Sequence, residues 1–158
     1  MTIEVAVKKT EPMTVAFIFR KAHFSQIPQA FGVLYPWLQQ KGYTPSGPPL
    51  GVYYSDMQQV PPEEMEWELW APISDEVAPF GADEQGLGVK TVEAIDVACT
   101  MHKGPYDQVG PVYGELFSWI VANGYEVAGP PQEVYLNDPG PTHAADLLTE
   151  IRFPVKKK

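Results

Sequence analysis

Apolar side chains recur every three or four residues in two stretches of the chain, which is the period of one helix face. The first stretch predicts a helix over Ser25–Gln40, and the second predicts a helix over Asp107–Asn123. Ser25 and Asp107 are good N-cap residue types, so we expect each helix to start there. The apolar positions that carry the two periodicities are Ile27, Phe31, Leu34 and Leu38, and Val109, Tyr113, Leu116 and Ile120.

Short runs rich in β-branched and bulky apolar residues predict strands on both sides of each helix. One strand precedes each helix and two follow it. Pro72 and Pro154 are expected to end the last strand of each set, because proline lacks the N–H that a sheet needs. The predicted strands are Met13–Phe19, Leu50–Ser55 and Glu66–Ala71, then Ile95–Met101, Gln132–Asn137 and Leu148–Phe153, with extra strands near Ile3–Lys8 and Gly88–Val92.

The chain is a duplication, because a shift of 82 residues aligns residues 7–73 with residues 89–155 without a gap. The period is too long for a solenoid, so we expect two fused halves related by a pseudo-twofold axis. An exposed linker over residues 74–86 joins them. Identical pairs include Val15/Val97, Lys21/Lys103, Gln26/Gln108, Gly32/Gly114, Trp37/Trp119, Gly42/Gly124, Tyr43/Tyr125, Gly47/Gly129, Tyr53/Tyr135, Glu68/Glu150 and Pro72/Pro154.

The order of elements in each half is β-α-β-β, which predicts an α+β fold. One helix on a small antiparallel sheet leaves apolar surface uncovered, so we expect the two halves to pack into a single domain over residues 1–158. Their junction would then form a cleft, and ligand sites favour such junctions.

Composition and charge narrow the possible partners. The 158 residues carry a net charge of −9, so a phosphate backbone would be repelled and direct DNA binding is not expected. A cationic or neutral small molecule is easier to attract. No apolar run approaches the roughly 18 residues of a membrane span, and the N-terminus lacks an apolar signal core. A lone cysteine, Cys99, excludes an internal disulfide and favours the cytoplasm.

Neither a metal nor a cofactor is predicted. The histidines are isolated and no His/Cys/Asp spacing is typical of a zinc or iron site. The sequence also lacks a Gly-rich phosphate loop. We expect Cys99 to be a small buried hydrophobe and His102 to lie on the surface at a strand end. The alternatives are that His102 approaches the cleft and that a cysteine–histidine pair is catalytic.

Three segments in order give the chain a family resemblance: HKGPYDQVGPVYGELFSWIVANGY, GPPQEVYLNDP and LLTEIRFPV. They resemble the GyrI-like small-molecule-binding domain, which also serves as the effector-binding part of AraC-type and multidrug-sensing regulators. The resemblance implies two β-α-β-β modules that form a curved antiparallel sheet with helices packed on one side. It also implies a central cleft for aromatic, often cationic, ligands, with a buried glutamate and aromatic side chains. Because residue 1 starts almost directly on the first strand, we expect a stand-alone member.

The clearest difference between the two copies is Gly51 against Glu133. Residues two apart share a strand face, so Glu133 lies beside Tyr135, as Gly51 lies beside Tyr53. A glutamate here would ordinarily lie on the solvated face of an antiparallel sheet. The resemblance instead places it in the cleft, where Gly51 would leave room for a ligand opposite it.

Two further glutamates and three aromatic residues are candidates for the cleft. Glu68 and Glu150 occupy equivalent positions, so either a shared structural hydrogen bond or cleft lining explains them equally well. Tyr106 starts the second helix and aligns with Phe24, so only the second copy has the hydroxyl. Trp37 and Trp119 lie on the helices, where an aromatic residue belongs to the core more often than to a ligand site.

These residues support several functions. In the first, a carboxylate among aromatic rings binds aromatic, cationic or electrophilic xenobiotics for sequestration or sensing. In the second, Glu133 is the general base and Tyr135 the acid of a hydrolase for reactive cyclopropane-type compounds. Their spacing of about 7 Å along the strand would leave room for a reacting atom. A third possibility is an interaction with DNA gyrase, although no dense acidic run supports it. A homodimer is possible through the sheet edges.

Overall fold

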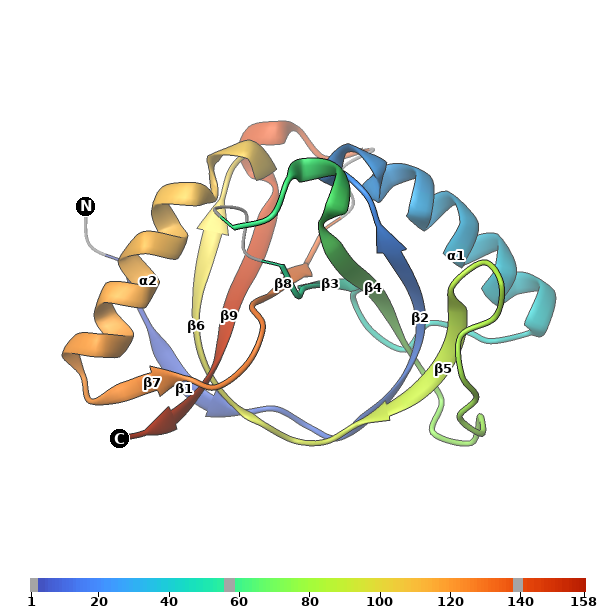
Figure 1. Cartoon of the computed structure of the whole chain (residues 1–158), viewed down its shortest axis with the longest axis horizontal. Helices are drawn as coiled ribbons and strands as arrows, with labels where there is room; N and C mark the ends of the chain where they lie inside the picture. Colours follow the sequence, from blue (N-terminus) through green and yellow to red (C-terminus); the bar gives the residue numbers. More distant parts are fainter. Residues whose placement is uncertain (1–2, 56–58, 138–140) are drawn as a thin grey trace. The chain divides into compact units, whose positions relative to one another are not determined.

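The computed structural model describes residues 3–55, 59–137 and 141–158. The chain divides into two compact units, each with one α-helix and an antiparallel sheet (Figure 1). We call Pro12–Glu93 the N-unit, and Met1–Glu11 together with Ala94–Lys158 the C-unit. The α+β class predicted from the sequence is therefore confirmed.

The N-unit packs helix α1 (Ile27–Lys41) on one face of four antiparallel strands of the sheet. Ala30, Leu34 and Leu38 are the buried residues of the helix. The apolar spacing predicted Leu34 and Leu38 but not Ala30, and the other two predicted positions, Ile27 and Phe31, are half-buried. The strands, in spatial order, are β3 (Leu50–Tyr53), β4 (Glu66–Ile73), β2 (Met13–Lys21) and β5 (Leu87–Val92), and two 3₁₀ turns lie at Phe24–Gln26 and Pro62–Glu64.

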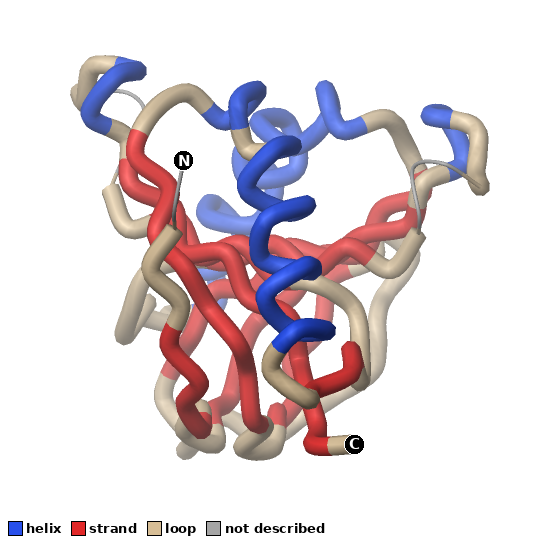
Figure 2. Tube along the Cα trace, turned by 90° about the vertical axis from the view of Figure 1, so that its left-hand side faces the viewer, coloured by secondary structure: helices blue, strands red, loops and turns tan. Residues whose placement is uncertain are grey.

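The C-unit repeats this plan with helix α2 (Gly110–Ala122), which lies in front of the strands in Figure 2. Val112, Leu116 and Ile120 are its buried stripe. A short strand that the sequence did not predict, β7 (Tyr125–Val127), pairs with the end of β9. The other strands, in spatial order, are β1 (Ala6–Lys9), β6 (Asp96–Lys103), β9 (Leu148–Lys157) and β8 (Gln132–Tyr135), and 3₁₀ turns lie at Tyr106–Gln108 and Ala144–Asp146.

The first strand of each sequence repeat pairs with strands of the other repeat. Strand β1 precedes the first repeat's core strands, yet it pairs with β6 of the second repeat. Strand β5 opens the second repeat, yet it pairs with β2 of the first. The registers of the two pairings are equivalent. Ala6 faces Cys99 in one, Gly88 faces Phe17 in the other, and the repeat shift of 82 residues relates Ala6 to Gly88 and Phe17 to Cys99. Each compact unit therefore contains residues of both repeats.

The predicted starts of the helices were wrong. Ser25 and Asp107 lie inside 3₁₀ turns, and the α-helices begin after Gln26 and Val109. Each α-helix has a proline in its first turn, where the missing N–H costs nothing and the fixed φ favours the helix. This proline, and not a polar side chain, marks the start.

The predicted ends of the last strands were also wrong, because β4 continues through Pro72 and β9 continues through Pro154. In an antiparallel strand the N and O atoms of one residue point to the same side. The Pro72 carbonyl accepts from the Ser46 N–H at 2.8 Å, so the missing N–H also points to that side and away from β2. Pro154 makes the same contact with the Ala128 N–H at 2.7 Å.

Gly88 makes room for an aromatic ring in the N-unit. A Cβ atom at this position would lie 2.7 Å from the Phe17 ring and 2.8 Å from the Phe80 carbonyl oxygen. The C-unit has Ala6 opposite the smaller Cys99 at the equivalent positions. The glycine in one unit and the alanine in the other therefore match the volumes of the facing side chains.

We predict that Gly88→Ala destabilises the protein by about 1–3 kcal/mol, because neither the buried ring nor the backbone carbonyl can move freely away. The free energy of unfolding in urea, followed by circular dichroism, measures this. Gly32→Ala is the matched control, since no atom lies within 4 Å of its Cβ position on α1. That change should stabilise the helix by about 0.5–1 kcal/mol. Equal effects of the two variants would contradict this role of Gly88.

Candidate functional site

Glu133 lies on the face of its sheet that α2 covers. It pairs with Ile151, a member of the apolar cluster under that helix. The side chain is half-buried, so it is not on a fully solvated face. From α2, the Tyr113 hydroxyl donates a hydrogen bond of 2.5 Å to one carboxylate oxygen. The Tyr135 hydroxyl donates a longer one, 3.4 Å, to the other oxygen.

Two more of the residues discussed from the sequence lie near this carboxylate. The ring of Tyr106 packs edge-on against Tyr135, with centroids 5.4 Å apart. His102 is buried and its charge acts on Glu133, so the expected surface position was wrong. Its Nε2 atom lies 3.0 Å from the Pro105 carbonyl oxygen and must donate, because a carbonyl only accepts. The turn after β6 therefore folds back over this histidine.

Burial raises the pKa of Glu133, because removal from water penalises the charged form. The hydrogen bonds from Tyr113 and Tyr135 and the charge of His102 act in the opposite direction, but burial prevails. A positive charge placed beside the carboxylate would lower this pKa again. The site thus combines a poorly solvated acid with three tyrosines, Tyr113, Tyr135 and Tyr106.

The N-unit repeats the aromatic framework without the acid. Tyr53 packs edge-on against Phe24, with centroids 5.3 Å apart, as Tyr135 packs against Tyr106. Gly51 takes the place of Glu133 and is buried. The idea that Gly51 and Tyr53 leave room for a ligand opposite the acid stays a prediction.

Sequence reasoning missed Tyr113 as a site residue. Its position fits the apolar stripe of the helix, and for that reason it was interpreted as core. The signal was present in the repeat, because the equivalent residue is Phe31, which has no hydroxyl. The same phenylalanine-to-tyrosine difference drew attention to Tyr106.

Trp37 and Trp119 each pack against a tyrosine of their own unit, edge-on in the N-unit and stacked in the C-unit. Trp37 lies 5.8 Å from Tyr43, and Trp119 lies 6.1 Å from Tyr125, between ring centroids. Both tryptophans border the apolar cluster of their unit. These contacts favour a structural role, and a role in ligand binding stays a prediction for both.

Glu68 and Glu150 lie on the other face of each sheet, away from the helix. Each forms an ion pair that spans one strand: Glu68 with Lys90, and Glu150 with Lys8 at 3.0 Å. The two lysines are repeat equivalents that sequence reasoning missed, although they are an identical pair. Both come from the exchanged strands β5 and β1.

Glu150 has a second cationic partner. The Arg152 Nε atom donates to it at 2.6 Å. Burial acts to raise the pKa of Glu150, but the hydrogen bonds and charges of Arg152 and Lys8 outweigh it, so this pKa is lowered. Cys99, on the strand between them, is buried as expected.

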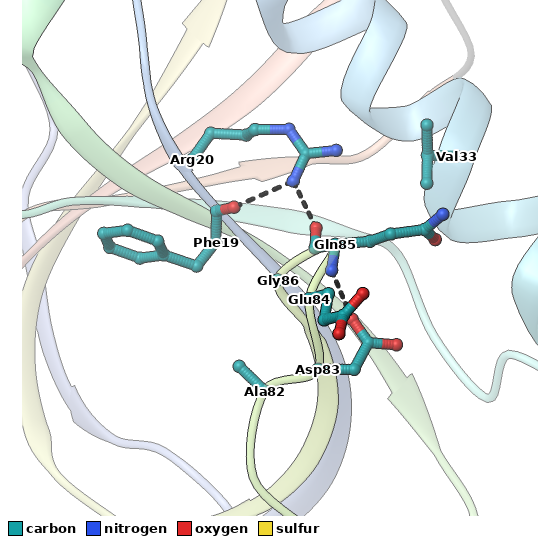
Figure 3. A pocket seen from close by; sticks show the side chains of 8 residues that line it. All are labelled: Phe19, Arg20, Val33, Ala82, Asp83, Glu84, Gln85 and Gly86. Carbon is teal, nitrogen blue, oxygen red and sulfur yellow. Dashed lines mark hydrogen bonds between the residues drawn. The ribbon is translucent and has the colours of Figure 1, made fainter.

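A separate groove of about 550 Å³ lies in the N-unit, between the end of β2 and the loop before β5 (Figure 3). The Arg20 guanidinium lies across it and donates to the carbonyl oxygens of Phe19, at 3.0 Å, and Gln85, at 2.5 Å. Its role there is to hold the loop. None of the site residues predicted from the sequence lines this groove.

Among the residues that the structure describes, no three metal-ligating side chains gather at one place. In the same residues, neither helix combines the length and the apolar character needed to cross a membrane.

Comparison with known proteins identifies the family. The model of the GyrI-like small molecule binding domain matches residues 3–156. The chain belongs to the GyrI-like family. This confirms the resemblance noted in the sequence.

A curated relative supports this assignment. A DNA gyrase inhibitor of Erwinia billingiae (strain Eb661) is 28% identical over 160 residues, which cover 99% of each chain. Among solved structures, the C-terminal domain of EcmrR is 26% identical, with a TM-score of 0.80 and complete coverage of both chains. In an EcmrR–DNA complex (TM-score 0.85, 24% identity), the whole GyrI-like chain matches and spans 59% of the EcmrR chain.

A more distant structure shares the fold alone. SAV2435 bound to tetraphenylphosphonium is 18% identical, with a TM-score of 0.60, and the match covers 98% of this GyrI-like chain and 94% of SAV2435.

The raised pKa of Glu133 predicts a pH-dependent penalty on stability. Because the pKa of Glu133 is higher in the folded protein than in the unfolded chain, folding favours the protonated carboxyl group. The protonated group contributes its full stability below the ordinary glutamate pKa, and this contribution is lost as the pH rises through the raised pKa. We therefore expect Glu133→Gln to raise the thermal midpoint at pH 7, and the gain should shrink toward pH 4. Glu126→Gln, which removes an acid of the same unit that pairs with Lys156, should give no such gain. A Glu133→Gln variant that is less stable at pH 7 would contradict the expectation.

Proposed function

We propose that this GyrI-like chain binds a small aromatic cation at Glu133, with Tyr113, Tyr135 and Tyr106 around the bound charge. One observation carries the proposal: Glu133 is poorly solvated but has no basic partner in the ion pairs of the described residues. Of two other semi-buried acids, Glu68 pairs with Lys90, and Glu150 pairs with both Lys8 and Arg152. A cationic ligand is the missing partner.

The residues around Glu133 fit such a ligand. Each aromatic face adds about 0.5–2 kcal/mol of attraction to a cation. Tyrosine hydroxyls that already point at the carboxylate keep it oriented without neutralising its charge. The net charge of −9 favours the approach of a cation over that of an anion.

The comparisons support this proposal at a coarser level. The family is described as binding small molecules, and SAV2435, which shares the fold, has been solved with a lipophilic aromatic cation. The gyrase inhibitor supports a gyrase partner by its name alone. Sequestration or sensing of aromatic xenobiotics is thus the proposal that best joins the site to its relatives.

Hydrolysis is a second candidate, favoured by one feature of the site. A carboxylate with a raised pKa beside two hydroxyls can act as a general base with an acid close by. However, the gap expected between Glu133 and Tyr135 is closed, because the hydroxyl reaches the carboxylate. A substrate would have to break this hydrogen bond before water could be activated.

We predict that tetraphenylphosphonium binds the wild-type protein saturably and binds Glu133→Gln roughly 10- to 100-fold more weakly, as the loss of a charged partner costs about 1–3 kcal/mol. Isothermal titration calorimetry measures both affinities, with Glu126→Gln as the control that keeps wild-type affinity. If Glu133→Gln binds as tightly as wild type, the assignment of Glu133 is wrong.

Binding should also depend on pH. The cation needs the ionised carboxylate, so affinity should rise with pH through the raised pKa of Glu133 and then level off. Below that pKa each bound cation releases a proton, which calorimetry in two buffers of different ionisation enthalpy detects. The slope should vanish in Glu133→Gln. A slope that persists in that variant would assign the proton to another group.

The hydrolase candidate is separated from binding by product analysis. Incubation of the protein with an excess of an electrophilic cyclopropane compound, followed by mass spectrometry, should show stoichiometric binding without turnover. Product formed over many protein equivalents, and lost in Glu133→Gln, would favour the hydrolase instead.

A further inference from the structure

The N-unit holds a second carboxylate among aromatic rings, on the sheet face opposite α1. Glu68 Oε1 accepts a hydrogen bond from the Trp70 indole N–H at 2.8 Å and another from the Tyr54 hydroxyl at 3.0 Å. The Lys90 ammonium bonds to the same oxygen. It stands 4.8 Å from the centroid of the Phe17 ring and 4.9 Å from that of Trp70. A positive charge is thus held by an acid and two ring faces.

The aromatic part of this cluster is not needed for the ion pair. In the C-unit, Lys8 and Glu150 make the same pair across the same number of strands. The residues equivalent to Phe17, Trp70 and Tyr54 are Cys99, Arg152 and Leu136. Since the ion pair exists without rings in one unit, the rings in the other unit require a further explanation.

The cluster also opens onto free space. A groove of about 410 Å³ is lined by Phe17, Phe80 and Lys90, with Pro79, Gly81 and Val89. Phe80 is 40% exposed there, although it is a large apolar side chain. The volume lies within the range of small-molecule sites, roughly 300–1,000 Å³. Gly88, beside Lys90 on β5, allows the Phe17 ring to form one wall of this space.

We propose that Glu68, Trp70 and Phe17 form a second ligand site, for alkylated ammonium compounds with an aromatic group, and that Lys90 occupies it when no ligand is bound. The ligand's ammonium would replace that of Lys90 beside Glu68, and its aromatic group would lie against Phe80 in the groove. The lysine side chain, already one-third exposed, would turn into solvent. This site is distinct from Glu133, which lies in the other unit.

Charge and hydration favour this exchange. A replacement of one cation by another leaves Glu68 paired, whereas an anion in the groove would face that acid. A primary ammonium is strongly hydrated and gains from release into water. An alkylated ammonium is less hydrated and gains more from the ring faces.

The test uses the full chain with Glu133→Gln as the parent protein. Binding at the proposed Glu133 site is weakened in this parent, so the result for the Glu68 site does not depend on whether the Glu133 proposal is right. The probe is benzyltrimethylammonium, titrated by calorimetry. We expect Lys90→Ala to bind it at least about tenfold more tightly than the parent. Glu68→Gln added to Lys90→Ala should remove this gain.

Lys8→Ala is the control, because it removes the equivalent lysine in the C-unit, where the rings are absent and Arg152 still pairs with Glu150. It should bind the probe no more tightly than the parent. The proposal is overturned if Lys90→Ala and Lys8→Ala behave alike, or if the gain of Lys90→Ala survives Glu68→Gln.

A second measurement uses the parent protein, which keeps Lys90, and so tests the proposal even if Lys90→Ala does not fold. In the ¹H–¹⁵N spectrum of the parent, the Trp70 indole resonance should move saturably with the probe, because this N–H bonds to Glu68. The Trp67 indole, which bonds to the Ala22 carbonyl on the other face, should not move. A static Trp70 resonance at saturating probe would overturn the proposal.

Discussion

A carboxylate withdrawn from water needs a partner, and the way each partner is supplied organises this protein. Glu150 is paired with Lys8 and Arg152, and Glu68 is paired with Lys90. Glu133 forms none of the ion pairs found among the described residues: it accepts two hydroxyl hydrogen bonds and feels the charge of His102, yet burial still raises its pKa. Two acids are paired within the fold itself, and the third is the one for which we propose a cationic ligand.

The exchange of first strands explains why two of the acids are satisfied. Lys8 lies on β1 and Lys90 on β5, and each strand joins a sheet whose other strands come from the other repeat. The ion pairs therefore link the two repeats within each unit. They also fix the register of the exchanged strands, since a slip of one residue would turn each lysine to the opposite face. Charge pairing and topology thus depend on one another.

The local elements could be predicted from the sequence, and the long-range ones could not. Apolar spacing predicted both helices, because α1 and α2 bury a stripe with the helical period. It could not show that Pro72 stays within β4, because that depends on which side of the strand has a partner. Comparison of the repeats drew attention to Glu133 as a candidate, since Gly51 has no carboxylate. It did not identify Tyr113, whose hydroxyl was hidden by a position typical of core.

The asymmetry between the units also has a consequence for stability. Gly51 and Glu133 occupy equivalent positions, each on the helix-covered face. A side chain there is unnecessary for the fold, since the N-unit forms the same sheet without one. A half-buried acid with a raised pKa lowers stability at neutral pH, so packing alone does not account for it. Residues kept against stability are characteristic of sites that act on a ligand, which is the reason that we propose a ligand for Glu133.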